Sequence, residues 1–311
     1  MPIPSADTSQ RKPEWLKVRA PGGDEYAGLK HTLKGLNLYT VCEEANCPNI
    51  GECWGEGTAT IMIMGDTCTR GCRFCNVKSG DPGGRLDPME PVNTARALEG
   101  LEDLSYVVIT SVDRDDLPDG GASHYAQTVR EIKRLRPDMM LETLIPDFSG
   151  DRDALRVLIE AGPEVIAQNQ ETVRRLTREV RDVRADYDLT LRVLSDLKSL
   201  APEVRSEPLW TKSSLMVGLG ETEEEMAEAM DDLRAVDVDF LTIGQYLRPS
   251  SKHLPVKEYV TPEQFDAYRV IGEEKGFKYV ASGPLVRSSY RAGEFFIQSV
   301  IKGGKDGEEA D

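Results

Sequence analysis

The sequence predicts an α/β protein built from six βα units. Short apolar runs of strand length alternate with stretches of helical periodicity over most of its 311 residues. Runs that are apolar almost throughout are typical of parallel strands whose outer face is covered by helices. Six units are too few to close an eight-fold barrel. We therefore expect a partial, TIM-like (β/α)6 barrel and not a flat doubly wound sheet.

The elements are predicted from the spacing of apolar residues. The predicted strands are 59–65, 105–110, 140–145, 165–169, 214–217 and 240–246. The predicted helices between them are 93–101, 123–135, 152–161, 171–180, 189–200 and 223–236. A helix is also expected over 24–38, and another begins at Thr261-Pro262 and runs to Lys275, ahead of an apolar segment at 279–281.

These elements divide the chain into four parts. Residues 1–58 form an N-terminal arm, a helix and a cysteine loop, and residues 59–250 form the barrel core. Residues 251–302 form a C-terminal extension. The charged tail 303–311 is expected to be disordered.

Composition narrows the class of function. The net charge is −16, from 54 acidic against 38 basic residues, which repels phosphate and makes nucleic acid an unexpected partner. The sequence contains neither a basic start followed by an apolar run nor 18 consecutive apolar residues, so we expect no secretion and no membrane insertion. In a cytoplasmic chain, clustered cysteines more often indicate metal or redox chemistry than disulfides.

All six cysteines lie between residues 42 and 75, in two triplets. The first triplet is Cys42, Cys47 and Cys53; the second is Cys68, Cys72 and Cys75. Zinc sites usually come as two close pairs, or as one pair plus nearby histidines, and here the three histidines are far apart. The second triplet follows the first predicted strand, so it belongs at the mouth of the barrel, where βα proteins carry their chemistry. A structural zinc site or chance spacing is the alternative.

The Cys-x3-Cys-x2-Cys spacing of the second triplet resembles the signature of the radical S-adenosylmethionine enzymes. The resemblance implies that Cys68, Cys72 and Cys75 hold a [4Fe–4S] cluster with one iron left open for adenosylmethionine. A reduced cluster in contact with the sulfonium injects one electron and releases a 5′-deoxyadenosyl radical. Phe74 would pack near the adenine.

Further motifs narrow the resemblance to one family within that superfamily, the lipoyl synthases. They lie at 11–17, 41–53, 108–121, 142–147, 212–222, 245–250 and 283–290, so the likeness extends from about residue 11 to 293. It implies that Cys42, Cys47 and Cys53 hold an auxiliary [4Fe–4S] cluster. Its fourth ligand would be Ser289 of the Arg287-Ser-Ser-Tyr290 motif, with Ser288 as the less favoured neighbour.

The activity that this resemblance implies is radical insertion of two sulfur atoms, at C6 and C8 of an octanoyl chain attached to a lysine of a carrier protein. The auxiliary cluster would be the sulfur source. The implied partners are an octanoylated glycine-cleavage H protein or dehydrogenase E2 lipoyl domain, a ferredoxin- or flavodoxin-type reductant, and iron–sulfur assembly proteins.

The remaining candidate residues follow predicted strands. Glu142, Asn169 and Arg248 are expected to contact adenosylmethionine, with surface salt bridges or strand-end caps as the alternative. Gly218 and Gly220 offer a ligand close backbone approach or form a plain βα turn.

The chain departs from the family pattern at one site, and one lysine has two interpretations. Many relatives have His-Asn followed by an aliphatic residue where this chain has Gln168-Asn169-Gln170. Glutamine cannot titrate near neutral pH, so we assign position 168 no proton-transfer role. Lys212 is the first residue of the motif at 212–222, and its alternative interpretation is an exposed residue at the start of a strand.

Two other functions remain open from the sequence. Another radical enzyme with an auxiliary cluster would share the second triplet, although the first triplet together with residues 287–290 disfavours it. An electron-transfer protein would need neither a barrel of about 200 residues nor an open iron position.

Overall fold

The computed structural model describes residues 11–18, 22, 24–36, 38–44, 47, 49–51, 60–100 and 104–289. Its core is an eight-stranded sheet in the order β1-β2-β5-β6-β7-β8-β9-β10. The strands are β1 (Tyr39–Thr40), β2 (Thr60–Ile63), β5 (Tyr106–Ser111), β6 (Met140–Leu144), β7 (Val165–Ala167), β8 (Trp210–Val217), β9 (Phe240–Gln245) and β10 (Tyr279–Gly283). From β2 to β10 every neighbouring pair is parallel, and β1 is antiparallel to β2.

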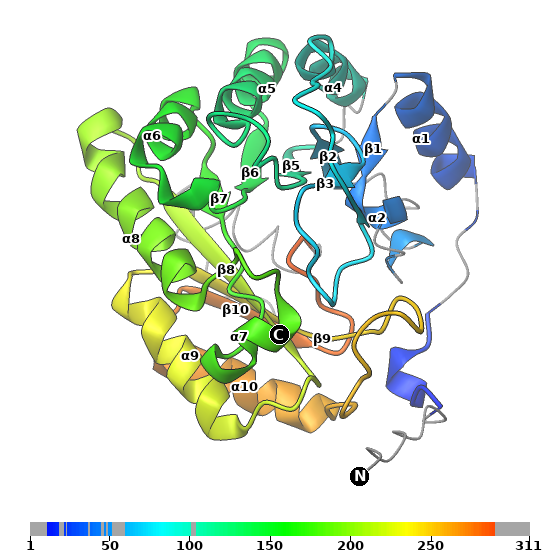
Figure 1. Cartoon of the computed structure of the whole chain (residues 1–311), viewed down its shortest axis with the longest axis vertical. Helices are drawn as coiled ribbons and strands as arrows, with labels where there is room; N and C mark the ends of the chain where they lie inside the picture. Colours follow the sequence, from blue (N-terminus) through cyan, green and yellow to red (C-terminus); the bar gives the residue numbers. More distant parts are fainter. Residues whose placement is uncertain are drawn as a thin grey trace, which may run out of the picture.

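The six predicted strands all form, and the sheet curves into a partial barrel (Figure 1). β10, from the predicted C-terminal extension, adds a further parallel strand beside β9. A separate two-stranded sheet pairs β3 (Thr67–Cys68) with β4 (Lys78–Ser79) and frames the loop of the second triplet.

Helices cover the outer face of the sheet, in an arc from α4 round to α10 in Figure 1. The long helices are α1 (Asp24–Gly35), α4 (Glu90–Glu99), α5 (Ala122–Leu135), α6 (Arg152–Ala161), α8 (Tyr187–Val204), α9 (Glu223–Ala235) and α10 (Pro262–Glu274). Short turns of helix are η1 (Glu14–Leu16), α2 (Val41–Glu44), η2 (Phe148–Gly150), η3 (Arg174–Leu176) and α7 (Thr177–Val180).

The starts of several helices are fixed by side chains that accept hydrogen bonds from the free amides of the first turn. Asp151 caps α6 and Asp186 caps α8 in this way. Thr222 and Glu225 form a capping box at the start of α9. Thr261 caps α10, with Pro262 at the first helical position, as the sequence predicted.

The predicted helix over 171–180 forms only in part, from Arg174 onward. Glu171 has a left-handed backbone (φ 68°) and forms a bridge with Leu215 of β8, so the chain stays extended past the end of β7. Only the short η3 and α7 follow before α8. The helical spacing therefore holds from residue 174, and strand-like pairing at the barrel mouth overrides it at Glu171.

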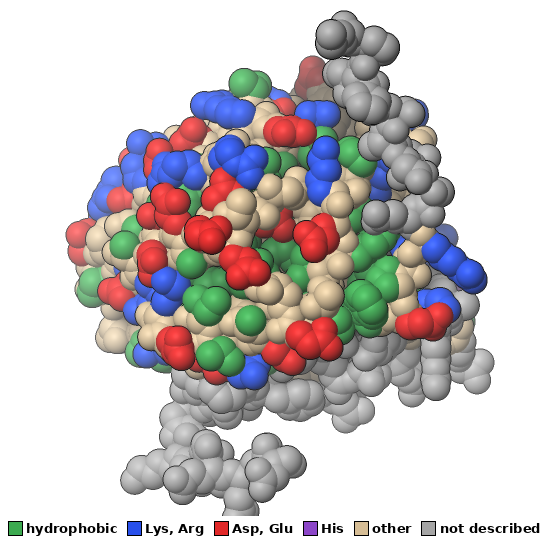
Figure 2. Space-filling model, turned by 90° about the horizontal axis from the view of Figure 1, so that it is seen from below, with side chains coloured by type: hydrophobic (Ala, Val, Ile, Leu, Met, Phe, Trp, Pro, Cys, Tyr) green, Lys and Arg blue, Asp and Glu red, His purple; other side chains and the backbone are tan. Residues whose placement is uncertain are grey.

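The surface carries mixed charge. Figure 2 shows red and blue side chains interspersed over the face seen from below, with apolar side chains between them. On this face the acidic excess of the chain is therefore dispersed among basic side chains. Among the described residues, no helix is long and apolar enough to cross a membrane.

A buried ion pair spans the barrel interior. Lys212 of β8 lies 2.8 Å from both carboxylate oxygens of Glu142 on β6, and the hydroxyl of Tyr106 donates to the same carboxylate. Lys212 is only 5% exposed, so its interpretation as an exposed strand-start residue is wrong. The carboxylate of Glu142 is thus satisfied inside the barrel.

Replacing Lys212 with methionine is expected to destabilise the fold by about 3–5 kcal/mol, because it leaves the buried Glu142 carboxylate without its counter-ion. The double variant Lys212→Met, Glu142→Leu should recover most of that loss, and Lys78→Met, at an exposed lysine, should have little effect. Urea unfolding of the four proteins measures this. Equal destabilisation of the single and double variants would show that the pair is not the cause.

Candidate functional site

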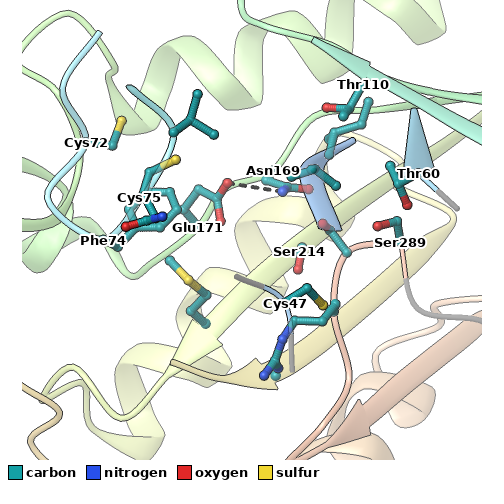
Figure 3. A pocket seen from close by; sticks show the side chains of 18 of the residues that line it. Cys47, Thr60, Cys72, Phe74, Cys75, Thr110, Asn169, Glu171, Ser214 and Ser289 are labelled. Atoms are coloured by element: carbon teal, nitrogen blue, oxygen red, sulfur yellow. Dashed lines mark hydrogen bonds between the residues drawn. The ribbon is translucent and has the colours of Figure 1, made fainter. Parts of the chain in front are cut away.

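A cavity of about 490 Å³ opens at the carboxyl ends of the strands. The sequence-predicted residues that line it are Cys42, Cys47, Cys68, Cys72, Phe74, Cys75, Asn169, Arg248, Ser288 and Ser289. In Figure 3, Cys72 and Cys75 lie on one side and Cys47 and Ser289 on the other, with Asn169 and Ser214 between them. Cys53 lies outside the described residues.

The second triplet is carried over the mouth by a sharp turn after β2. Met64 and Gly65 both have left-handed backbones (φ 67° and 88°). Glu90 holds the turn in place. Its carboxylate accepts a hydrogen bond from the Met64 amide at 2.8 Å and lies 2.7 Å from Nε2 of His124. His124 therefore has a structural role.

The thiols of the second triplet sit among backbone donors. The Arg70 amide donates to the Cys68 sulfur at 3.4 Å, and the Asp182 amide donates to the Cys72 sulfur at 3.3 Å. Burial raises the pKa of Cys68 to about 12, of Cys72 to about 11 and of Cys75 to about 12. Such thiols release their protons when a metal binds.

The arrangement suits a cluster better than a single ion. Among the described residues, no three Cys, His, Asp or Glu side chains are placed to hold one metal ion. Thiolates of a cubane bind different irons and need not converge on one point. Hydrogen bonds from amides to the sulfurs are also one means by which proteins set the reduction potential of such clusters. The second triplet therefore fits a [4Fe–4S] cluster.

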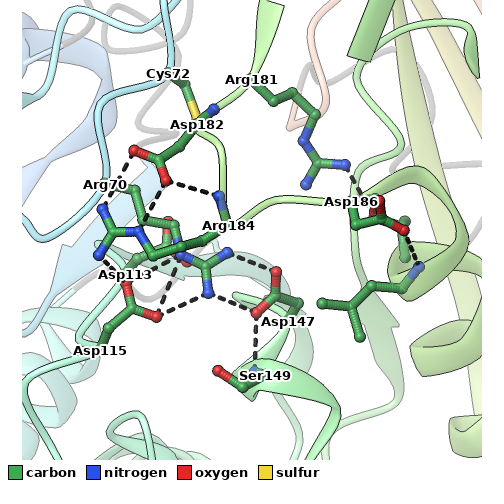
Figure 4. Close-up of polar contacts among 12 residues, drawn as sticks. Arg70, Cys72, Asp113, Asp115, Asp147, Ser149, Arg181, Asp182, Arg184 and Asp186 are labelled. Atoms are coloured by element: carbon green, nitrogen blue, oxygen red, sulfur yellow. Dashed lines mark hydrogen bonds and ion pairs between the residues drawn. The ribbon is translucent and has the colours of Figure 1, made fainter. Parts of the chain in front are cut away.

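Arg70 anchors this loop (Figure 4). Its side chain is 5% exposed and forms paired contacts with two carboxylates. Nη1 and Nη2 lie 2.5 Å and 2.7 Å from the two oxygens of Asp147, and Nη2 lies 2.8 Å from Asp115. Asp113 lies 3.3 Å from Nε. The network ties the cysteine loop to the loops that follow β5 and β6.

The sequence did not single out this network. It drew attention to the motifs at 108–121 and 142–147, but gave no indication that Arg70, between Cys68 and Cys72, would be the cation that their carboxylates share. An arginine between Cys68 and Cys72 was the one available signal.

The first triplet lies across the cavity. Cys42 is buried at the start of α2, and the Cys47 amide donates to the Cys42 carbonyl at 3.0 Å. The Asn49 side chain donates to the Leu285 carbonyl at 2.7 Å, which joins this loop to the segment that carries Ser288 and Ser289. The cysteine loop and the far end of the described chain therefore meet at one wall.

That C-terminal segment passes tightly over β9. A Cβ added to Gly244 would lie 2.1 Å from the Val286 carbonyl oxygen, so only glycine allows the approach. Arg287 donates to the Gln245 and Val286 carbonyls. Its Nη2 is out of contact with solvent and has no partner among the described residues. An unpartnered guanidinium nitrogen near Cys47 suits an anionic group such as a thiolate-bound cluster.

Between the two walls lies Asn169, whose amide donates to the Glu171 carboxylate at 3.1 Å. Glu171 also lines the cavity, and burial raises its pKa. The sequence missed Glu171 because it was assigned to a helix start. Gln168 is buried, and its Oε1 has no partner among the described residues.

Arg248 lines one edge of the cavity, and the segment that follows it holds it in place. Arg248 donates to the carbonyls of His253 and Ser251 at 2.9 Å and 2.6 Å, and a ring nitrogen of His253 lies 3.0 Å from the Cys75 carbonyl. Phe74 packs partly buried against the neighbouring core. These contacts hold the last cysteine of the loop against the wall.

Three predicted contacts do not line the cavity. Glu142 is paired with Lys212 in the barrel interior. Gly218 and Gly220 have left-handed backbones (φ 96° and 104°), and a Cβ on Gly218 would lie 2.1 Å from Gln245. This is the geometry of a tight βα turn. A role of these residues in cofactor binding stays a prediction.

The comparisons with known proteins agree with this geometry. Residues 62–233 match the model of the radical SAM superfamily, and residues 4–47 match the N-terminal domain of lipoyl synthase. The solved structure of the [FeFe]-hydrogenase maturase HydG has a TM-score of 0.56 at 15% identity, covering 92% of this chain and 61% of that one. The solved structure of methylornithine synthase has a TM-score of 0.52 at 16% identity, covering 92% of this chain and 84% of that one. The protein is a radical SAM enzyme.

The curated relatives specify the family. The lipoyl synthase of Anaeromyxobacter dehalogenans (strain 2CP-C) is 59% identical over 292 residues, covering 94% of this chain and 97% of its own. The chloroplastic lipoyl synthase of Arabidopsis thaliana is 56% identical over 306 residues, covering 97% of this chain and 76% of its own. The chain belongs to the lipoyl synthase family, a family of sulfur-inserting enzymes whose cofactors are adenosylmethionine and [4Fe–4S] clusters. The matches do not support the two alternative functions.

Proposed function

We propose that this enzyme inserts sulfur at C6 and C8 of an octanoyl chain held on a lysine of a carrier protein. The observation that carries the proposal is one cavity lined by cysteines of both triplets, with Cys72 and Cys75 on one side and Cys47 on the other. A chain lying between the walls has a radical source on one side and a sulfur source on the other. A carbon radical then meets sulfide within a bound complex.

Each set of ligands has a separate task. Cys68, Cys72 and Cys75 would hold the cluster that binds adenosylmethionine. Cys42, Cys47, Cys53 and Ser289 would hold the auxiliary cluster. When bound, these groups supply the electron that cleaves the sulfonium and the sulfur that enters the product. A serine oxygen is a harder ligand than thiolate for iron, which would ease loss of that iron as sulfur leaves.

The cavity wall suits an aliphatic substrate. Apolar side chains from strands and loops line it, among them Met62, Val112, Leu144, Ile145 and Met216. They bury an octanoyl tail favourably, at about 0.8 kcal/mol per CH2. They also keep water from the carbon that reacts.

Polar residues at one wall would orient adenosylmethionine. We assign Asn169, Arg248 and Phe74 to it, and add Glu171, whose partly buried carboxylate lines the same cavity. A cationic ligand beside Glu171 would favour its ionised form. Arg181, buried and lining the cavity, supplies a positive charge for a ligand carboxylate.

The partners are proposed at the level of class. The substrate is a carrier protein bearing octanoyl-lysine, either a glycine-cleavage H protein or an E2 lipoyl domain, and iron–sulfur assembly proteins supply the clusters. Free thiols and such clusters persist in reducing compartments, so we propose the cytoplasm.

The assignment of Ser289 has a direct test. Ser289→Ala removes the proposed fourth ligand, so sulfur insertion should fall to background and auxiliary iron should be lost. Ser288→Ala is the matched control and should keep both. Iron counting and assay of lipoyl product on an octanoyl-lysine peptide measure the two effects. The reverse pattern would make Ser288 the ligand, and full activity in both variants would contradict a serine ligand.

A further inference from the structure

Arg287 places a positive charge in the wall that carries the first triplet. Its side chain lines the cavity, next to Ser288. Nη1 donates to the Val286 carbonyl at 2.6 Å and, at 3.4 Å, to the Gln245 carbonyl. Nη2 is out of contact with solvent and has no hydrogen-bond partner in the part of the chain that the structure describes. One end of the guanidinium is therefore held, and the other end has a free donor.

The charge of Arg287 is not balanced by a carboxylate. Arg70 and Arg114, which are also buried, are both paired with aspartates. Within the described ranges, the one titratable group that acts on the charge of Arg287 is the Cys47 thiol. Asn49 Oδ1 is buried and unpartnered on the same wall, but it is neutral. Burying a charge without a counter-ion is costly, so this position suits an anion.

The backbone fixes where this charge lies. A Cβ added to Gly244 of β9 would lie 2.1 Å from the Val286 carbonyl oxygen and 3.4 Å from Nη1 of Arg287. The side chain of Asn49 donates to the same segment at 2.7 Å. The segment that carries Arg287 is thus joined both to β9 and to the loop of the first triplet. Ser289 follows two residues later.

We propose that Arg287 is the counter-ion of the auxiliary cluster and sets its reduction potential. This inference rests on the proposed function, in which that cluster is held by Cys42, Cys47, Cys53 and Ser289. Three thiolates and a serine oxygen carry more negative charge than the iron–sulfide core carries positive charge, so the loaded site is anionic. A guanidinium keeps its charge at every working pH and is donor-only, which suits sulfur ligands. Arg287 is a positioning residue, because it acts through the cluster and not on the substrate.

The charge of Arg287 should affect the loaded and the cluster-free protein differently. A positive charge beside a cluster favours its reduced, more negative form, and so raises its reduction potential. It also offsets the repulsion among anionic ligands, which keeps iron in the site. In the cluster-free protein the same charge has no counter-ion and therefore contributes little to stability.

The test isolates the auxiliary cluster in the full chain by replacing the three cysteines of the second triplet with alanine. In this background Arg287→Met removes the charge and Arg287→Lys keeps it. Arg269→Met is the control, at an arginine on α10 that is 41% exposed and paired with Glu273. Redox titration followed by EPR gives the reduction potential, and release of iron to a chelator gives its retention. Urea unfolding of the cluster-free proteins gives their stability.

Arg287→Met should lower the reduction potential of the auxiliary cluster and speed the release of its iron about tenfold. Arg287→Lys and Arg269→Met should stay close to the unmodified side chains in both measurements. In the reciprocal background, with the cysteines of the first triplet replaced, Arg287→Met should leave the potential of the remaining cluster unchanged. The cluster-free Arg287→Met protein should unfold at nearly the same urea concentration as its parent.

An Arg287→Met protein whose auxiliary cluster keeps both its potential and its iron would overturn the proposal. An equal fall in potential in Arg287→Lys would also overturn it, because lysine retains the charge. A large loss of stability in the cluster-free Arg287→Met protein would show that the side chain serves the fold and not the cluster. Failure of the proposed function is separate: the first triplet with Arg287 intact would then bind no cluster.

Discussion

Replacing Cys47 with alanine should abolish sulfur insertion and leave adenosylmethionine cleavage, whereas Cys72→Ala should abolish both. The two cysteines lie in different walls of the same cavity. Loss of Cys47 removes a ligand of the proposed sulfur donor but leaves the second triplet and the Arg70 network intact. Loss of Cys72 removes the radical source, on which every later step depends.

Both variants are measured by iron content, 5′-deoxyadenosine and lipoyl product. Each should fall from roughly eight irons to roughly four, one cubane lost. Cys47→Ala should then form 5′-deoxyadenosine without product, while Cys72→Ala forms neither. If Cys47→Ala still made product at the normal rate, Cys47 would have no part in the sulfur donor.

Replacing Arg70 with methionine should cost the fold about 3–5 kcal/mol, because three carboxylates would remain at the mouth without the cation they share. Asp147 is buried and Asp115 and Asp113 are partly buried, so water cannot fully replace the guanidinium. The loop of the second triplet would lose its anchor to the loops after β5 and β6. Cluster loading should fall with stability.

The control for this prediction is Arg134→Met, at an arginine on α5 that is exposed and paired with Glu131. It should change stability by less than about 1 kcal/mol. Urea unfolding of the cluster-free proteins and iron counting after reconstitution measure both effects. An Arg70→Met protein as stable as the control, with a full complement of iron, would show that the network does not position the loop.

Much of the fold could be predicted because it depends on local patterns. Continuous apolar runs identified the six strands, and the position of Cys68 just past β2 placed the second triplet at the mouth. The rule that chemistry gathers at carboxyl ends of parallel strands then brought distant segments to one face. The strands needed no tertiary information because both faces of each are buried.

The rest depends on contacts that spacing does not encode. Glu142 follows the pattern of a mouth residue, yet its place in the middle of β6 directs it to Lys212 inside the barrel. Helical spacing over 171–180 gave no sign that Glu171 would pair with Leu215 and face the cavity. Likewise, Arg70 finds its three carboxylates only when the loops of β5 and β6 meet.

The central claim is that two cysteine sets, facing one cavity, make this chain a two-cluster sulfur-inserting enzyme. Anaerobic reconstitution followed by reaction with adenosylmethionine, dithionite and an octanoyl-lysine peptide tests it most directly. The expected result is roughly eight irons per chain and about two 5′-deoxyadenosines for each lipoyl product. Roughly four irons, or cleavage of adenosylmethionine without any sulfur insertion, would contradict the claim.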